Sequence, residues 1–298
     1  ATERVNPPLF TSIASVVLNS VLNYILIYGK LGMPALGLRG AAIATLTSTA
    51  FQSVLLLIVL RSSKDIFNEH LKHFFALSKS FVRRFSVVCL PVVANEVAWA
   101  IGTNIYAMVF ARQGSECYAG YTVFSSVEQV AFVFFVGICH ACAIMTGKTI
   151  GEGNEKGAYK LAQKFVIMTP IIGIITGTVL ALARHPMLSL LEIETQGAYD
   201  IAAKLIMLYC FWLPIRNIPY TLIVGTFRAG GDTKIGVLFD CLSLYLIGVP
   251  LVVYLGLFAK VDFVYLIIAM YLGEDIPKTI LSIWRFVSKK WIRNLTDR

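Results

Sequence analysis

Eight apolar segments, each long enough to cross a lipid bilayer, divide this chain of 298 residues. Only helices and closed barrels satisfy their backbone hydrogen bonds inside lipid, and a helix needs about 20 apolar residues to span it. The segments do not alternate apolar and polar residues, which excludes barrel strands. We therefore predict an all-α integral membrane protein. The predicted spans cover residues 9–29, 40–60, 86–110, 119–147, 160–183, 199–227, 234–257 and 263–287.

Basic residues are distributed unevenly between the two sets of connecting loops. The side that holds both termini carries 18 Lys and Arg residues with its loop flanks, and the opposite side carries 5. Because basic loops stay in the cytoplasm, we expect a plasma or inner membrane protein with both termini cytoplasmic. Anionic lipid facing these loops accounts for the net charge of +9, and no segment is long enough for a nucleic-acid-binding domain. The chain begins at Ala1 without a signal peptide, so we expect its start to be a cut or partial one.

Two short motifs resemble catalytic or nucleotide sites, but their surroundings argue against that chemistry. Cys139-His140-Ala141-Cys142 is one isolated pair in an apolar segment, whereas a zinc or redox site needs further ligands. Gly147-Lys148-Thr149 ends like a phosphate-binding loop, but the required earlier glycine is replaced by Cys142. We expect a protein that is not an enzyme and has no cofactor, driven by an ion gradient or by a partner.

Glu96, in the third predicted span, is the polar residue that most strongly indicates a function. Ionisable groups at membrane depth are energetically costly and tend to serve binding or transport. Pro91, Asn95 and Trp99 share a face of the helix by their spacing of four, and Pro91 can kink it. We expect Glu96, with Asn95, to exchange a proton or to bind Na⁺ or a cationic drug. The alternative is a carboxyl group that only bonds a neighbouring helix.

Further charged residues lie in the last two predicted spans. Asp240 is either a second binding carboxylate or an interfacial one that the start of its helix favours. Glu274 and Lys278 are four residues apart, so we expect an ion pair within the eighth span. Arg216 lies between two prolines, and we expect the sixth span to break there, either to line a cavity or as a simple kink.

Asn19, Asn23 and Thr45 form a second candidate site, on the first two spans. The two asparagines are one helical turn apart, and Thr45 follows Gly40 and several alanines that allow close helix packing. Their oxygens could complete a Na⁺ site if a carboxylate joined them. Ordinary hydrogen bonding between the two helices is the alternative.

Four sequence motifs, in this order, resemble the multidrug and toxic compound extrusion (MATE) family. The resemblance extends over nearly the whole chain. The motifs are Asn19–Gly29 with the following Gly32–Thr45, then Pro91–Gly102, Phe227–Thr233 and Ser288–Trp291.

The resemblance implies a twelve-helix fold in two six-helix lobes, of which helices five to twelve are present. Residues 1–62 would be the last two helices of the first lobe, and 63–78 a cytoplasmic linker between lobes. Residues 79–298 would be the second lobe with a cytoplasmic tail. The first four helices would be missing.

For the sites, the resemblance implies that Asn19, Asn23 and Thr45 match a cation site whose aspartate lies on the absent first helix. Glu96 matches an acidic residue of helix seven. A family carboxylate on helix ten has no clear counterpart here, because residues 199–227 contain only Asp200 at their edge.

The function implied is a secondary active antiporter that exports organic, cationic and amphipathic drug-like compounds in exchange for H⁺ or Na⁺. It would work by alternating access, as a monomer surrounded by membrane lipid and without nucleic acid. Two alternatives remain at this point. One is a flippase for lipid-linked saccharides, which would need a strongly cationic cavity with Arg216 and Lys204 as candidates. The other is an inactive fragment.

Overall fold

The computed structural model describes residues 6–62, 78–191, 193 and 195–292, and the regular structure in these ranges is helical throughout. All eight predicted spans are helices. In chain order the elements are α1 (Asn6–Tyr28), α2 (Leu38–Ser62), α4 (Lys79–Ala111), α5 (Ser115–Gly151), α6 (Glu155–Ser189), α7 (Gln196–Tyr220), η2 (Thr221–Phe227), α8 (Thr233–Cys241), η3 (Leu242–Gly248), α9 (Val249–Val253), η4 (Tyr254–Phe258) and α10 (Phe263–Val287).

Seven helical segments in the described residues are long and apolar enough to cross a membrane. The segment α7 with η2 is one of them, and α8 through η4 forms another. The eighth predicted span, α10, has the required length but carries Glu274, Asp275 and Lys278 near its middle. Two of these side chains are buried inside the protein, with Asp275 5% and Lys278 9% exposed, so the charges of α10 are directed at neighbouring helices.

The chain divides into two compact units, residues 1–82 and 83–298. In unit 1, α1 and α2 pack against each other closely because Gly40 has no side chain. A β-carbon at Gly40 would lie 2.6 Å from the carbonyl oxygen of Leu26. The predicted linker 63–78 lies outside the described residues except for Ser78.

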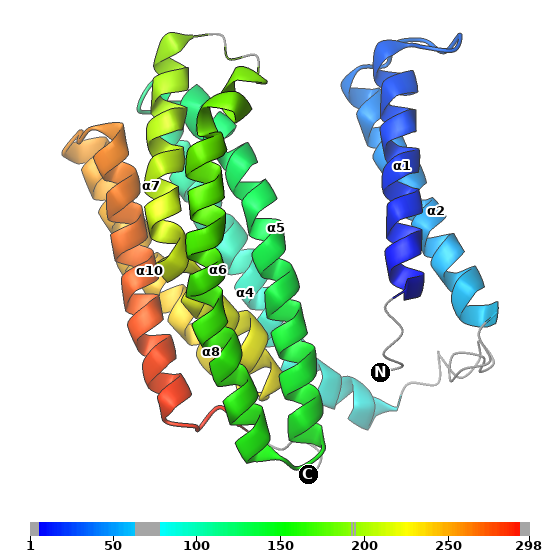
Figure 1. Cartoon of the computed structure of the whole chain (residues 1–298), viewed down its shortest axis with the longest axis vertical. Helices are drawn as coiled ribbons and strands as arrows, with labels where there is room; N and C mark the ends of the chain where they lie inside the picture. The colour runs from blue at the N-terminus through cyan, green and yellow to red at the C-terminus, as the bar shows by residue number, and fades with distance from the viewer. Residues whose placement is uncertain (1–5, 63–77, 192, 194, 293–298) are drawn as a thin grey trace. The chain divides into compact units, whose positions relative to one another are not determined.

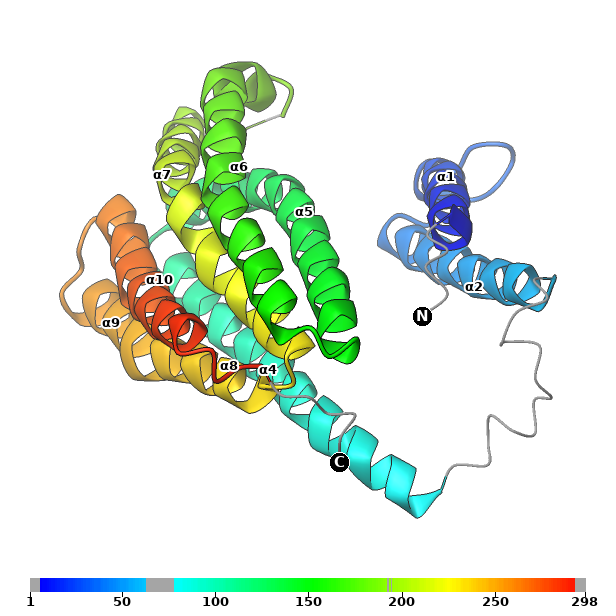
Figure 2. The same cartoon turned by 60° about the horizontal axis from the view of Figure 1, so that its bottom comes forward.

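Unit 2 is a bundle in which α4 through α10 run side by side (Figure 1). The first turns of α4 extend beyond the neighbouring helices (Figure 2). Helices α6 and α7 approach until Gly173 and Gly177 face the backbone of Pro214 and Cys210. A β-carbon at either glycine would lie within 2.8 Å of that backbone, so larger residues would separate the two helices.

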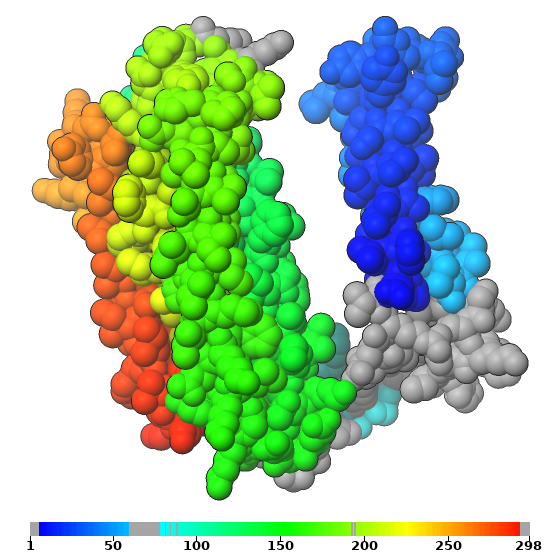
Figure 3. Space-filling view, in the orientation of Figure 1, coloured from blue at the N-terminus to red at the C-terminus, as the bar shows by residue number. Residues whose placement is uncertain are grey.

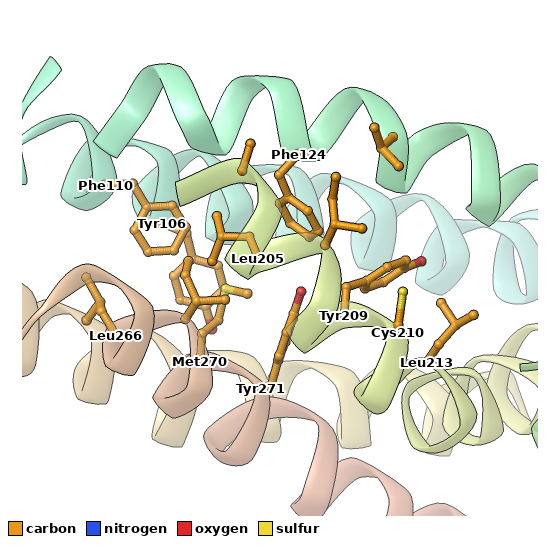
Figure 4. Packing of buried hydrophobic residues seen from close by; sticks show 14 of the residues in the cluster. Tyr106, Phe110, Phe124, Leu205, Tyr209, Cys210, Leu213, Leu266, Met270 and Tyr271 are labelled. Atoms are coloured by element: carbon orange, nitrogen blue, oxygen red, sulfur yellow. The ribbon is translucent and has the colours of Figure 1, made fainter. Parts of the chain in front are cut away.

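Aromatic side chains from several helices fill the centre of unit 2 (Figure 4). The ring of Phe110 meets that of Phe263 edge to face at 5.5 Å, and Phe124 meets Tyr209 in the same way at 5.7 Å. The outside is also apolar: α6, which covers one face of unit 2 in Figure 3, exposes large side chains such as Leu182. A helix bundle that is apolar inside and outside suits a lipid environment.

The predicted break at Arg216 is wrong, because the helix continues through both prolines. Helix α7 contains Pro214 and Pro219 and passes directly into the π-helical segment η2. The wider π turn changes the backbone partners after Pro219, which lets the chain stay helical without the amide that proline lacks.

A buried ion pair and a buried tryptophan hold the residue before α8 and the residues after α10 against α10 at one end of unit 2. Asp232, only 1% exposed, precedes α8 and forms an ion pair with Arg285 of α10. Its Oδ2 accepts a hydrogen bond from Arg285 Nε at 2.8 Å and lies 2.7 Å from Arg285 Nη2. Arg285 also donates to the carbonyl of Lys290. Trp291 is fully buried and stacks on Phe286, so the residues after α10 are held against the bundle.

Candidate functional site

A cavity of about 170 Å³ lies within unit 2, between α4, α5, α7, η2, α8 and α10. Its wall combines charged, amide and aromatic side chains. The residues that line it are Asn95, Glu96, Trp99, Phe132, Arg216, Asn217, Pro219, Tyr220, Ile223, Val224, Arg228, Asp240, Glu274, Asp275 and Lys278. Three of the predicted site residues, Asn95, Glu96 and Asp240, therefore share one cavity.

Lys278 pairs with two carboxylates of the cavity wall, those of Asp240 and Glu274. Its ammonium group is 3.1 Å from Asp240 Oδ1 and 2.9 Å from Glu274 Oε1. The other oxygens of both carboxylates are also bonded: Asn95 Nδ2 donates to Asp240 Oδ2 at 3.0 Å, and Tyr106 donates to Glu274 Oε2 at 3.3 Å. The predicted ion pair between Glu274 and Lys278 is confirmed. All four carboxylate oxygens have a donor from the protein.

Glu96 is more exposed than its position in the sequence suggested. Its side chain is 58% exposed and pairs with Arg228, whose Nη2 lies 2.7 Å from Glu96 Oε1. Asn95, the preceding residue on α4, is only 5% exposed and points at Asp240. The two neighbours therefore serve different parts of the cavity wall.

Arg216 is held in place by an acid and by two rings. Its Nη1 lies 3.1 Å from Glu128 Oε1 of α5. Its guanidinium carbon is 5.0 Å from the centre of the Tyr271 ring and 5.9 Å from that of Tyr209. Arg216 therefore lines the cavity with its charge compensated by Glu128, although the helix that carries it is not broken.

Asp275 is the remaining acid of the wall. It is 5% exposed, and Trp212 of α7 donates its indole N–H to Oδ2 at 2.7 Å. The Trp212 ring stacks on that of Tyr271 at 5.8 Å, which fixes the position of the donor.

The charges of the cavity wall leave an excess of negative charge. Four carboxylates line it, together with three cations, Arg216, Arg228 and Lys278. Each of these cations has a carboxylate within 3.1 Å. A positively charged or protonated guest therefore suits this cavity better than an anion.

In unit 1, the asparagines form a chain of hydrogen bonds that Thr45 does not join directly. Asn23 Nδ2 donates to Asn19 Oδ1 at 2.9 Å, and Asn19 Nδ2 donates to Ser48 Oγ at 3.1 Å. Thr45 is exposed, and its hydroxyl donates to the carbonyl of Ala41 on its own helix. Unit 1 therefore has interhelical hydrogen bonding at this position, and its three candidate residues do not converge.

Sequence reasoning missed Tyr106, Trp212 and Asp275 as parts of the site. Tyr106 and Trp212 both lie in apolar stretches of the sequence that indicate no polar partner for them. A weak signal existed for Asp275, since a second acid beside Glu274 in a membrane helix needs its own partner.

Comparisons with known proteins agree on one family. A family model described as MatE matches residues 91–254. The "Probable multidrug resistance protein NorM" of Thermotoga maritima is 24% identical over 283 residues, which cover 92% of this chain and 58% of that protein. The chain therefore spans a little over half the length of this relative.

Solved structures share the fold at low sequence identity. A MOP superfamily transporter from Pyrococcus furiosus, described as having a binding pocket of reverse polarity, gives a TM-score of 0.78 at 19% identity. It is matched over 94% of this chain and 62% of its own. The eukaryotic MATE transporter AtDTX14 gives 0.77 at 19% identity, over 98% and 64% respectively. The helices described above therefore match part of the MATE fold.

Proposed function

Because this chain belongs to the MatE family of membrane transporters, we propose that it is part of a secondary active multidrug efflux antiporter. The transporter would export organic, cationic and amphipathic drug-like compounds in exchange for H⁺ or Na⁺. Members of this family are multi-pass membrane proteins and not enzymes. The 18-to-5 distribution of basic residues supports an orientation with both termini in the cytoplasm.

The observation that carries the proposal is the acidic cavity of unit 2. Its wall pairs an excess of carboxylates with aromatic surfaces from Trp99, Phe132 and Tyr220. Ring faces and carboxylates together attract lipophilic cations, because the rings accept apolar contact and offer a negative face. The relatives' names, which refer to multidrug resistance, support drug-like substrates.

Within this proposal, Glu96, Asn95 and Asp240 belong to the ion- and substrate-binding wall. The exposed Glu96 would meet a cationic substrate at the cavity edge, in competition with Arg228 at 2.7 Å. Asp240, held by Asn95 and Lys278, would act deeper in the cavity. Asn19, Asn23 and Thr45 remain candidates for a Na⁺ site only if other residues supply a carboxylate.

A saccharide-lipid flippase is the second candidate function, and the charge pattern argues against it. Such a flippase binds diphosphate groups and would need cations that are free to meet them. Arg216, Arg228 and Lys278 all lie within 3.1 Å of a carboxylate.

Ethidium efflux tests the proposed function directly. The chain, together with any sequence that precedes it in its gene, is expressed in cells that lack their own drug pumps. We expect efflux that stops when a protonophore is added or when Na⁺ is removed, which also identifies the coupling ion. Correct insertion without efflux of ethidium or other lipophilic cations would contradict the proposal.

The variant Glu96→Gln tests the role of the cavity edge. We expect it to insert normally and to lose most ion-coupled ethidium efflux, because it removes one carboxylate and frees Arg228 to repel cations. Asp200→Asn, which makes the same chemical change at an exposed position on α7, is the control. Efflux equal to that of the unaltered protein would remove Glu96 from the binding wall.

A further inference from the structure

The four acids of the cavity wall differ in the partners that compensate their charge. Glu96 pairs with Arg228, and both Asp240 and Glu274 pair with Lys278. Asp275 has no such partner: among the described residues, no Lys, Arg or His nitrogen lies within 4.0 Å of its carboxylate. Of the four, it is the acid that receives a hydrogen bond from a neutral group without an ion pair.

From this difference we propose that Asp275 is the carboxylate that exchanges the coupling proton as a cationic substrate enters and leaves the cavity. The inference rests on the proposed antiport function and specifies its ion and its residue. It also differs from the expectation, drawn from the sequence, that Glu96 is the proton-exchanging acid.

The other acids are less suited to carry a proton because cations already stabilise their charged forms. Protonating Asp240 or Glu274 would leave the ammonium group of Lys278 with one carboxylate fewer in a buried site. Protonating Glu96 would remove the negative charge that compensates Arg228. Adding a proton to Asp275 breaks no ion pair, and the Trp212 N–H can still donate to the carboxyl group.

The surroundings of Asp275 allow both of its forms to exist. Burial opposes the charged form, while the positive charges of Arg216 and Lys278 and the indole hydrogen bond support it. Glu274 on the same helix acts in the opposite direction from Arg216. The ionisable groups that face Asp275 are Arg216 and Tyr209 of α7, Tyr106 of α4, and Tyr271, Glu274 and Lys278 of α10.

The exchange step balances in charge. When a monovalent organic cation enters the cavity, the O–H bond of the protonated Asp275 breaks and the proton leaves to water. The carboxylate formed then compensates the positive charge of the guest. When the cation leaves on the outer side, a proton from that side binds Asp275 and restores the starting state. One proton is exchanged for one cation.

Lys278 explains why the same wall would not use Na⁺. A Na⁺ site needs several oxygens free to coordinate, but the four oxygens of Asp240 and Glu274 already accept bonds from Lys278, Asn95 and Tyr106. The ammonium group thus occupies the place between these two carboxylates that a monovalent metal cation would take.

The test measures ethidium binding and proton release together, on the purified full protein in detergent and weak buffer. We expect ethidium binding to release about one proton and to weaken by up to about tenfold per pH unit on acidification. Asp275→Asn should bind ethidium without proton release and with little dependence on pH, whereas Asp275→Glu should keep both. Asp200→Asn, the exposed control, should behave like the unaltered protein.

Ethidium binding tests the proposed function, and proton release tests the assignment of Asp275, so the two can fail independently. If the unaltered protein binds no ethidium, the proposed function fails first. If it binds ethidium without releasing a proton at any pH, or if Asp275→Asn still releases one, the assignment of Asp275 is overturned while drug binding stands.

A second variant keeps the test decisive if Asp275→Asn does not fold. Trp212→Phe removes the hydrogen bond to the charged carboxylate but leaves the acid in place. Since this bond stabilises the charged form, we expect the midpoint of the ethidium pH profile to move toward higher pH. A profile that does not move would overturn the assignment.

Discussion

The polar side chains of unit 1 are joined by neutral hydrogen bonds, whereas those of unit 2 are joined mainly by ion pairs. In unit 1, neutral amides and hydroxyls of α1 and α2 bond one another, as in the chain from Asn23 through Asn19 to Ser48. In unit 2, acids and bases from different helices meet around a cavity, with Lys278 bridging Asp240 and Glu274. Both arrangements bring polar groups of different helices into contact in an apolar surrounding.

The difference indicates which unit can respond to ions. A neutral hydrogen bond between membrane helices contributes about 0.6 kcal/mol and has no charge to gain or lose. A buried ion pair gives little net stability when complete, but removing one partner costs about 3–5 kcal/mol because a charge is left alone. We therefore expect the stability of unit 2 to depend more strongly on protons and cations than that of the described part of unit 1.

The largest effect should come from Lys278→Met, which leaves two carboxylates without their shared cation. We expect a loss of about 4 kcal/mol of unfolding free energy in Na⁺-free buffer. Na⁺ should restore about 2.7 kcal/mol at a hundredfold excess over its Kd, because the vacated place can now bind it. Thermal unfolding of the purified protein with and without Na⁺ measures both.

Lys204→Met is the matched control for this variant, since Lys204 is exposed on α7. It should be nearly neutral and show no response to Na⁺. A Lys278 variant that is as stable as this control would mean that the ion pairs of unit 2 matter no more than the hydrogen bonds of unit 1.

A somewhat smaller effect should follow from Arg285→Met, outside the cavity. Asp232 would lose its ion pair and its hydrogen bond with Arg285 while remaining buried, so we expect a loss of about 3 kcal/mol. In contrast to Lys278→Met, we expect Na⁺ not to restore stability, because here only one carboxylate, and not two, loses its contact with the substituted cation. Arg112→Met, at an exposed position, is the control in the same thermal unfolding experiment.

The smallest effect should come from Asn19→Ala in unit 1. It removes two neutral hydrogen bonds, to Ser48 and from Asn23, so we expect a loss of about 1 kcal/mol that does not change with pH or Na⁺. Ser20→Ala, whose hydroxyl bonds only its own helix at Val16, serves as control. A strong dependence on Na⁺ would instead show that unit 1 contains the cation site considered from the sequence.

Much of the fold followed from the sequence because each helix is a local feature. The apolar segments predicted eight helices, and all eight are present. The candidate site was predicted in part: Asn95, Glu96 and Asp240 share a cavity, but Thr45 does not join Asn19 and Asn23 directly. The break predicted at Arg216 was wrong, since a π-helical segment can follow the prolines without interrupting the helix.

By itself, the sequence determined the features that depend on neighbours along one helix. The ion pair of Glu274 and Lys278 is such a feature, because residues four apart lie on the same side of a helix. Only the tertiary structure decided which acid meets which partner across helices. Asn95 and Asp240 are 145 residues apart, and Glu96 and Arg228 are 132 apart. Such contacts depend on how helices rotate and pack, which leaves Asp275 facing an indole instead of a cation.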